Sequence, residues 1–175
     1  LPDRLKSEVE VVREERRLRT DNSIPGLLDE QLYATAFVGS PYAWPVVGWM
    51  KDLERITRDE MVEYFRTYYA PNNCILIVAG DFETAKTKAM IEKYFGPIPA
   101  QTPPPAPVNP EPEQMGERRA EVHYPSETVS FQMGYKAPSV KSDDLHALEL
   151  VAAMLAQGES SRLHRALVYE QQLAL

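Results

Sequence analysis

A proline-rich stretch constrains this chain more than any other feature of its sequence. Half of the sixteen residues from 97 to 112 are proline. Proline lacks a backbone N–H and has a fixed φ, so the stretch cannot continue a helix or a sheet and favours extended geometry. It predicts a semi-rigid linker over residues 97–117 between two folded pieces, residues 1–96 and 118–175. A ligand for domains with aromatic grooves is the alternative.

Charge and composition exclude several classes of protein. The formal net charge is −7, from 19 Lys and Arg against 26 Asp and Glu. No basic cluster is present to neutralise a run of phosphates, which argues against nucleic acid as a partner. No apolar run approaches the roughly 18 residues that a membrane span needs. The single cysteine, Cys74, excludes an internal disulfide and a cysteine-based zinc finger.

The two ends of the sequence suggest a piece of a longer polypeptide. Leu1 is followed by a charged stretch without the pattern of a signal peptide. Residues 169–175 continue without a stop signal. We therefore expect that the sequence is an excerpt in which targeting cannot be read.

Several segments have the periodicity and the end signals of helices. Thr57 and Glu60 form a capping box before one of them, and Gly96 follows the end of another. After the linker, Ser142 and Ser161 stand where each could cap a further helix. Before the linker, the expected helices cover residues 4–20, 27–37, 57–69 and 83–95.

Two segments have the patterns of strands. Residues 74–79 form a short apolar run, typical of a strand buried on both faces, so that Cys74 is expected to be an inert core residue. Residues 129–135 alternate between apolar and small or polar side chains, the period of a half-buried strand. Strands and helices mix without strict alternation, so we expect an α+β fold with mixed strands and helices.

The first helix carries the least ordinary feature of the sequence. Glu8 and Glu15 lie seven residues, or two turns, apart and fall within an apolar arc. Both carboxylates are therefore expected to point inward, which is costly unless each has a partner. The arc is bounded by Val11 and Leu18 on one edge and by Leu5 and Val12 on the other.

The spacing of these carboxylates leaves two interpretations open. Arg4 could pair with Glu8 and Arg19 with Glu15, both at the four-residue spacing of helical ion pairs. Alternatively, one carboxylate is a metal ligand and the second assists it from one helical level away. The helical pattern alone does not separate the two interpretations.

Histidines and common catalytic motifs supply no second site. All three histidines, His123, His146 and His164, follow the linker and are expected to be structural or surface residues. Residues 146–150 approach the zinc motif H-x-x-E-H, but Leu150 replaces the second histidine. The sequence contains no G-x-S-x-G motif, P-loop or dinucleotide-binding fingerprint.

A series of short motifs, in order along nearly the whole chain, resembles one enzyme family. The family is that of the insulinase/pitrilysin-type zinc metallopeptidases, which includes mitochondrial processing peptidase, and the likeness is closest to its bacterial members. The motifs are EVEVVREERR at 8–17, SPY at 40–42, PVVGWM at 45–50, YAPNN at 69–73, VAGD at 78–81, KYFGPIP at 93–99 and GESSRL at 158–163.

The resemblance implies roles for both glutamates. Glu15 matches the glutamate that is the third zinc ligand of the family, and Glu8 matches the acidic residue two turns earlier that assists catalysis. The other two ligands and the general base come, in the family, from an H-x-x-E-H motif on an earlier helix, which this sequence lacks. Residues 146–150 match the place of a decayed copy of that motif in the second lobe.

The resemblance also implies an architecture. Residues 1–96 correspond to the second half of the first, metal-binding lobe of a mitochondrial processing peptidase-type fold. Residues 118–175 correspond to the beginning of the second, non-catalytic lobe, so both lobes are incomplete. The proline-rich linker, residues 97–117, joins them.

The implied activity is that of a zinc-dependent metalloendopeptidase that hydrolyses peptides or unfolded segments. With one zinc ligand of three, this segment is expected to be inactive alone. Besides a peptide substrate, the implied partners are a second copy or an active or inactive subunit of the same family. A catalytically inactive partner subunit is the alternative function, and a proline-rich adaptor is disfavoured by the core patterning of both pieces. The likeness to bacterial members favours the bacterial periplasm.

Overall fold

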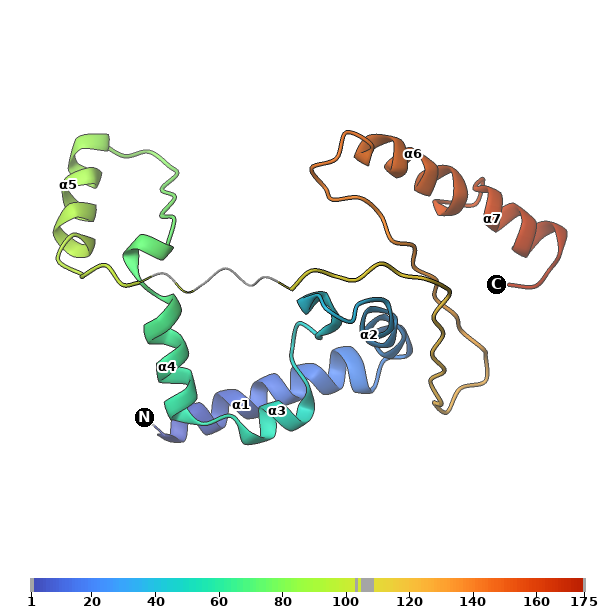
Figure 1. Cartoon of the computed structure of the whole chain (residues 1–175), viewed down its shortest axis with the longest axis horizontal. Coiled ribbons are helices and arrows are strands. Elements are labelled where there is room, and N and C mark those ends of the chain that lie inside the picture. The colour runs from blue at the N-terminus through green and yellow to red at the C-terminus, as the bar shows by residue number, and fades with distance from the viewer. Residues whose placement is uncertain (1, 103, 105–108, 175) are drawn as a thin grey trace. The chain divides into compact units, whose positions relative to one another are not determined.

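The computed structural model describes residues 2–102, 104 and 109–174 (Figure 1). The chain divides into two compact units, Leu1–Met133 and Gly134–Leu175, and each is described by itself. Within the described residues, no helix combines the length and the apolar character needed to cross a membrane.

Helices are the regular elements of both units, and the expected helices are confirmed. The four expected before the linker form with ends shifted by a few residues, and two form after it. The short α3 had not been expected. The first unit contains α1 (Pro2–Arg16), the π-helical turn η1 (Arg17–Asp21), α2 (Ile24–Ala36), η2 (Pro41–Ala43), α3 (Met50–Arg55), α4 (Arg58–Tyr68), η3 (Pro71–Asn73) and α5 (Thr84–Phe95), and the second contains α6 (Leu145–Ala156), α7 (Arg162–His164) and η4 (Arg165–Glu170).

The expectation of an α+β fold is wrong, because the described residues contain helices and no strand. Residues 74–79 and 129–135 lie outside any regular element. An apolar run or an alternating pattern indicates how side chains would be buried. A strand also requires a neighbouring backbone with which to form hydrogen bonds. Neither segment has such a neighbour among the described residues, and Ile75 is 90% exposed.

Local capping signals set where the helices begin. Glu60 N–H donates to Thr57 Oγ1 at 3.3 Å, and Thr57 N–H donates to Glu60 Oε2 at 2.7 Å, so the predicted capping box of α4 is confirmed. The Thr57 hydroxyl also donates to Glu60 Oε2 at 2.8 Å, and this bond, followed by the one from the Thr57 backbone N–H, holds the pKa of Glu60 below its ordinary value. Ser23 caps α2 in the same manner by accepting from Gly26 N–H at 3.2 Å.

The two serines expected to begin helices after the linker differ in their outcome. Ser161 stands at the N-cap position of α7, as expected, although its side chain makes no capping hydrogen bond. By contrast, α6 begins after Asp144, and Ser142 instead accepts a hydrogen bond from the Asp144 N–H at 3.3 Å. Ser142 thus forms a turn before the helix.

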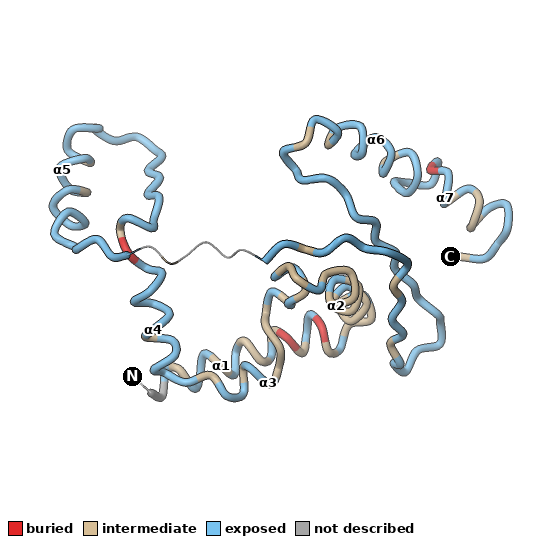
Figure 2. The backbone as a smooth tube through the Cα atoms, viewed as in Figure 1, coloured by how far each residue is buried: buried red, intermediate tan, exposed pale blue. Residues whose placement is uncertain are grey.

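Few residues are buried in the described part of the chain (Figure 2). Ala70 is the one buried apolar residue there, while Arg16, Thr20 and Ser161 are buried polar residues. Cys74 is exposed, so its interpretation as a core residue is wrong. Phe65 and Tyr69, at the end of α4, are exposed too, and their rings stack with centroids 4.9 Å apart. The rings of Tyr64 and Tyr68 are tilted against each other with centroids 4.5 Å apart.

A carboxylate within the predicted linker, that of Glu111, joins this segment to the residues after α2. Residues 103 and 105–108 of that linker lie outside the described residues. Glu111 accepts hydrogen bonds from the backbone N–H groups of Val38, Gly39 and Ser40 at 3.1, 2.8 and 2.9 Å. A Cβ on Gly39 would lie 2.7 Å from the carbonyl oxygen of Pro110, so only glycine permits this approach.

Arg118 adds a second connection to the same place. Its Nη1 donates to the carbonyl oxygens of Thr35 and Ala36 at 3.1 and 3.0 Å. These two carbonyls belong to the last turn of α2, where helical partners are missing. One carboxylate and one guanidinium, seven residues apart, therefore satisfy the groups that the end of α2 leaves unpaired.

We predict that Glu111→Ala releases the backbone at residues 38–40. Hydrogen bonds to a charged acceptor contribute roughly 1.5–3 kcal/mol, so amide exchange at these positions should become about tenfold faster or more. Hydrogen exchange followed by mass spectrometry measures this rate. Glu113→Ala is the matched control, because Glu113 lies two residues away and is exposed. Unchanged exchange at residues 38–40 in Glu111→Ala would contradict the prediction.

Candidate functional site

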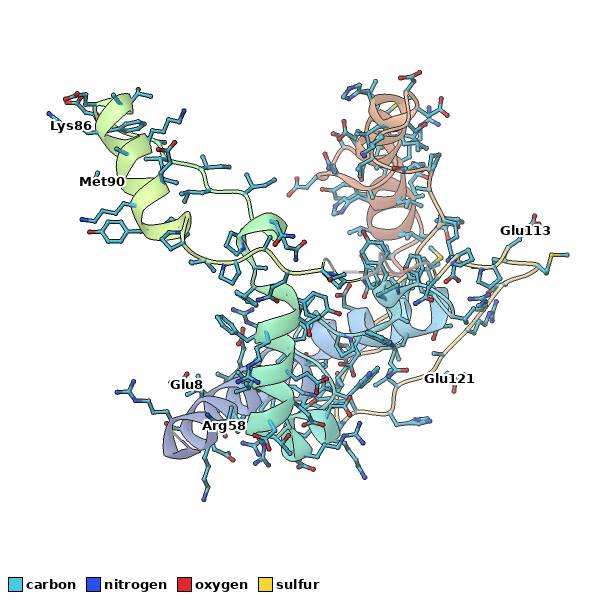
Figure 3. The ribbon with its side chains drawn as sticks, turned by 60° about the vertical axis from the view of Figure 1, so that its left-hand side comes forward. Glu8, Arg58, Lys86, Met90, Glu113 and Glu121 are labelled. Atoms are coloured by element: carbon cyan, nitrogen blue, oxygen red, sulfur yellow. The ribbon has the colours of Figure 1, made fainter. Side chains whose placement is uncertain are left out.

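The helix α1 brings Glu8 and Glu15 to one side, two turns apart. Glu8 lies on α1 and is exposed (Figure 3). It makes no ion pair with any described side chain. The pair between Arg4 and Glu8 that the spacing allowed is therefore not formed. An unpaired, solvated carboxylate keeps all its oxygen lone pairs available for a further group.

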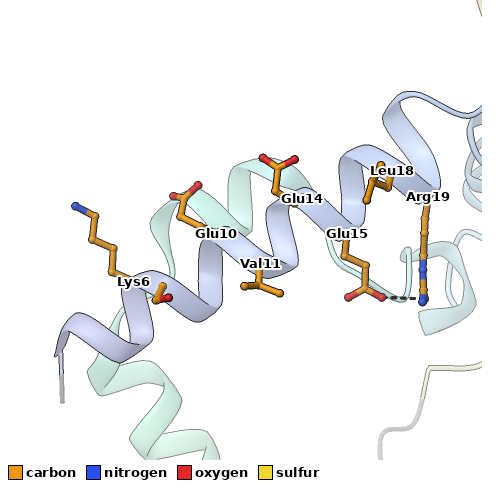
Figure 4. A pocket seen from close by; sticks show the side chains of 8 residues that line it. Lys6, Glu10, Val11, Glu14, Glu15, Leu18 and Arg19 are labelled. Atoms are coloured by element: carbon orange, nitrogen blue, oxygen red, sulfur yellow. Dashed lines mark ion pairs between the residues drawn. The ribbon is translucent and has the colours of Figure 1, made fainter.

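Glu15 has the partner that the spacing predicted. Its Oε1 lies 2.8 Å from Nη1 of Arg19, four residues on, and its side chain is 39% exposed (Figure 4). Both partners reach solvent, and such pairs contribute about 0–1 kcal/mol. The ion pair is therefore easily exchanged for another ligand of the carboxylate.

An open hollow runs along this side of α1, and Glu15 borders it (Figure 4). Its apolar lining comes from Val11 and from Leu18, which is 73% exposed. Two other carboxylates also line it, those of Glu10 and Glu14. Each forms an ion pair with the arginine three residues later in the sequence. The lining consists of Lys6, Ser7, Glu10, Val11, Glu14, Glu15, Leu18 and Arg19.

The chemistry of Glu15 fits one ligand of a metal site. A catalytic zinc is held by about three protein ligands, among which a glutamate oxygen is common. In the described part of the chain, no three His, Cys, Asp or Glu side chains come together to hold a metal ion. Glu15 thus fits as a single oxygen donor, and the remaining ligands would have to come from outside the described residues.

The inward direction expected for the two glutamates differs from what the structure shows. Val12, at one edge of the predicted arc, is partly buried, whereas Val11 and Leu18 at the other edge are exposed. The buried face of α1 is therefore rotated away from the middle of the arc and is centred on Arg16. Glu8 and Glu15 lie beside this face instead of within it.

Arg16, next to Glu15, is a buried charged residue that the sequence pattern did not single out. It is only 5% exposed, and its guanidinium donates two hydrogen bonds to the carboxylate of Glu30 on α2, at 2.8 and 3.1 Å. Nη1 also donates to the carbonyl oxygen of Gly48 at 2.8 Å, and the guanidinium carbon lies 5.7 Å from the ring centroid of Trp49. Asp21 completes the surroundings, with Oδ1 3.3 Å from Nη2.

Physical chemistry explains why this arginine is buried and charged. The hydrogen bonds to Glu30 raise the pKa of Arg16 above its ordinary value, while burial opposes them. Gly48 presents its carbonyl from a left-handed turn with φ +85°, a conformation that strains any other residue. One signal in the sequence indicates the burial of Arg16: on a helical wheel it lies close to the apolar residues Leu5 and Val12.

The near-match to a zinc motif in the second unit brings a histidine and a glutamate together. His146 and Glu149 lie on exposed positions of α6, with Nδ1 3.3 Å from Oε2. They interact with each other at the three-residue spacing of a surface pair, and no third ligand accompanies them among the described residues. His164 packs edge-on against Tyr169, with ring centroids 5.1 Å apart, a structural role as expected.

Comparison with known proteins places the chain among peptidases. A sequence profile of the family described as "Peptidase M16 inactive domain" matches residues 55–175. The zinc protease PqqE of Helicobacter pylori is 36% identical over 175 residues, covering 98% of this chain and 39% of that protein. A probable mitochondrial-processing peptidase subunit beta of Schizosaccharomyces pombe is 29% identical over 83 residues, which cover 45% of this chain and 18% of that protein.

A solved structure agrees with these relatives. The crystal structure of a protease from Helicobacter pylori superposes with a TM-score of 0.80 at 34% sequence identity. The match covers 99% of this chain and 42% of that one. The chain thus spans about two fifths of the length of these two bacterial proteins. The resemblance drawn from the short motifs is confirmed.

We predict that Arg16→Met lowers the free energy of unfolding by about 3 kcal/mol, because it leaves the Glu30 carboxylate buried without its partner. Urea denaturation followed by circular dichroism measures this loss. Arg17→Met is the control: Arg17 is partly exposed and pairs with Glu14 on its own helix, so the change should stay within about 0.5 kcal/mol. Equal losses in the two variants would contradict the prediction.

Proposed function

This chain belongs to the M16 peptidase family, and we propose that it forms part of a zinc-dependent metalloendopeptidase that hydrolyses peptides or unfolded segments. The observation that carries the proposal is the placement of Glu15. Its carboxylate borders an open hollow on α1, and its partner Arg19 is exposed and exchangeable. Similarity to a zinc protease over 98% of the chain supports the same function.

In this proposal Glu15 is the metal ligand that this chain contributes. Glu15 would hold the zinc through its carboxylate, whose exposed ion pair with Arg19 contributes little stability. Zinc, when bound, polarises the scissile carbonyl and lowers the pKa of a water molecule. The other ligands and the general base belong to a part of the protein outside this sequence.

Glu8 is proposed to assist catalysis from one helical level away. It is exposed and free of ion pairs within the described residues, on the same side of α1 as Glu15. A carboxylate in that position orients neighbouring groups or compensates their charge, as outer partners do around metal sites. It does so without binding the metal itself.

The remaining parts of the proposal concern the whole protein. The substrate would be an unfolded peptide. A second copy or another subunit of the family would be its partner, and the bacterial periplasm its compartment. Fractionation of cells that express the protein would test the compartment.

A catalytically inactive partner subunit is the second candidate function. Two observations favour it: the matching family profile is described as an inactive domain, and one relative is named as a subunit. Glu8 and Glu15 favour the active protease, since an inactive subunit needs neither. Zinc bound by the full-length protein at a stoichiometry near one separates the two candidates.

We predict that Glu15→Gln in the full-length protein weakens zinc binding by more than the roughly 10–100-fold that loss of an outer partner costs, because Gln replaces an anionic ligand with a neutral one. Competition with a chromophoric chelator measures the affinity. Glu14→Gln is the matched control, as Glu14 is the neighbouring carboxylate and is paired with Arg17.

Glu8→Gln is expected to reduce peptide hydrolysis by roughly 10–100-fold and to leave zinc bound. Wild-type zinc affinity in Glu15→Gln would exclude Glu15 as a ligand. No zinc in the full-length wild-type protein would favour the inactive subunit.

A further prediction concerns residues 1–175 expressed alone. One zinc ligand of three cannot hold a catalytic metal, so this piece should cleave no unfolded peptide, even with zinc added. A fluorogenic peptide assay, with the full-length protein as the positive control, measures this. Zinc-dependent turnover by the isolated piece would refute the prediction.

A further inference from the structure

We infer that Arg16 is a positioning residue for Glu15: by fixing the last turn of α1 against α2 and the loop before α3, it sets where the Glu15 carboxylate points. The inference rests on the proposed function, in which Glu15 is a zinc ligand. Arg16 itself touches neither metal nor substrate in this scheme.

The contacts of Glu15 cannot position its helix. Its partner, Arg19, lies one turn further on, so the ion pair joins two neighbouring turns of the same segment. The Glu10–Arg13 and Glu14–Arg17 pairs likewise stay within the segment. Such pairs stiffen a helix but do not relate it to the rest of the protein.

Arg16 supplies the connection that those pairs lack. One guanidinium bonds Glu30 on α2 and the carbonyl oxygen of Gly48, and it lies over Trp49. The ion pair from α1 to α3 is weaker, with Arg13 Nη2 3.4 Å from Oε1 of Glu54, whose side chain is half-exposed. Arg16 thus makes the buried polar connection between α1 and two other segments.

Helix geometry transmits this constraint to the next residue. Neighbouring residues on a helix are about 100° and 1.5 Å apart, so fixing Arg16 fixes the rotation and height of Glu15. The same guanidinium reaches Asp21 at the end of the π-helical turn η1, at 3.3 Å, and so also fixes the turn that carries Arg19. A Cβ on Gly26 would lie 2.0 Å from the carbonyl oxygen of Arg19, so α2 begins directly against this turn.

The shape of the guanidinium explains why this residue is an arginine. Its planar fork makes two parallel bonds to the Glu30 carboxylate while a third bond reaches a carbonyl. A lysine ammonium is a point charge that cannot reproduce the fork. Arg16→Lys therefore preserves the charge of the site and loosens its geometry, which separates positioning from charge.

The test measures zinc affinity in the full-length protein by chelator competition, with the thermal unfolding of the metal-free protein as a check on folding. Arg16→Lys should weaken zinc binding by about 10–100-fold, the usual effect of losing a partner that orients a ligand. Glu30→Gln changes the carboxylate that the Arg16 guanidinium bonds, and it should also weaken zinc binding. Arg17→Met is the control and should stay within about twofold.

A double-mutant cycle distinguishes positioning from a general structural role. In a Glu15→Gln background, Arg16→Lys should cause no further loss of zinc affinity, because the side chain that it positions no longer ligates. Equal losses with and without Glu15 would overturn the inference, since Arg16 would then act on the fold alone. Wild-type zinc affinity in folded Arg16→Lys and Glu30→Gln proteins would overturn it too.

The proposed function fails by a different result. If Glu15→Gln by itself leaves zinc affinity unchanged, Glu15 is not a ligand, and both the function and the inference built on it are refuted. If Glu15→Gln weakens binding while the Arg16 and Glu30 variants do not, only the positioning role is refuted. Should Arg16→Lys fail to fold, Glu30→Gln and its cycle with Glu15→Gln decide the question.

Discussion

A buried arginine organises the first unit of this protein. A charge removed from water is expensive unless it is paired and hydrogen-bonded, and Arg16 meets that condition with Glu30, with the carbonyl of Gly48 and with the ring of Trp49. Its partners belong to α2 and to the loop before α3. The relative positions of α1, α2 and that loop therefore depend on satisfying one guanidinium.

Polar connections of the same kind recur at the end of α2. Glu111 accepts from three backbone N–H groups, and Arg118 donates to two carbonyl oxygens of the last helical turn. Helix ends leave such groups without partners, so a charged side chain from a distant segment is strongly held there. In the described part of the chain, charged side chains thus join distant segments where an apolar core would usually do so.

The same principle links the fold to the proposed chemistry. In the proposed function Glu15 is a metal ligand, which must be accessible, and its carboxylate lies on the open side of α1 with an exposed partner. A ligand must also be held in place, and the neighbouring Arg16 is buried and bonded through both of its terminal nitrogens. Under the proposal, two adjacent residues of one helix would divide these two tasks.

The sequence by itself determined the local elements and the family. Helix starts follow from interactions over three or four residues, and the capping box of Thr57 and Glu60 formed as predicted. The pair between Glu15 and Arg19 is equally local. The spacing of Glu8 and Glu15 and the family motifs around them are enough to indicate both as candidate site residues.

Only the tertiary structure decided the rest, because the deciding interactions join residues far apart in sequence. Arg16 meets Glu30 and Gly48, 14 and 32 residues on, and Glu111 reaches back across more than 70 residues. The expected strands at 74–79 and 129–135 failed for the same reason: a strand exists only where another backbone lies beside it. Side-chain patterns indicate which residues tend to be buried, but the segments that pair with one another are decided only when the whole chain folds.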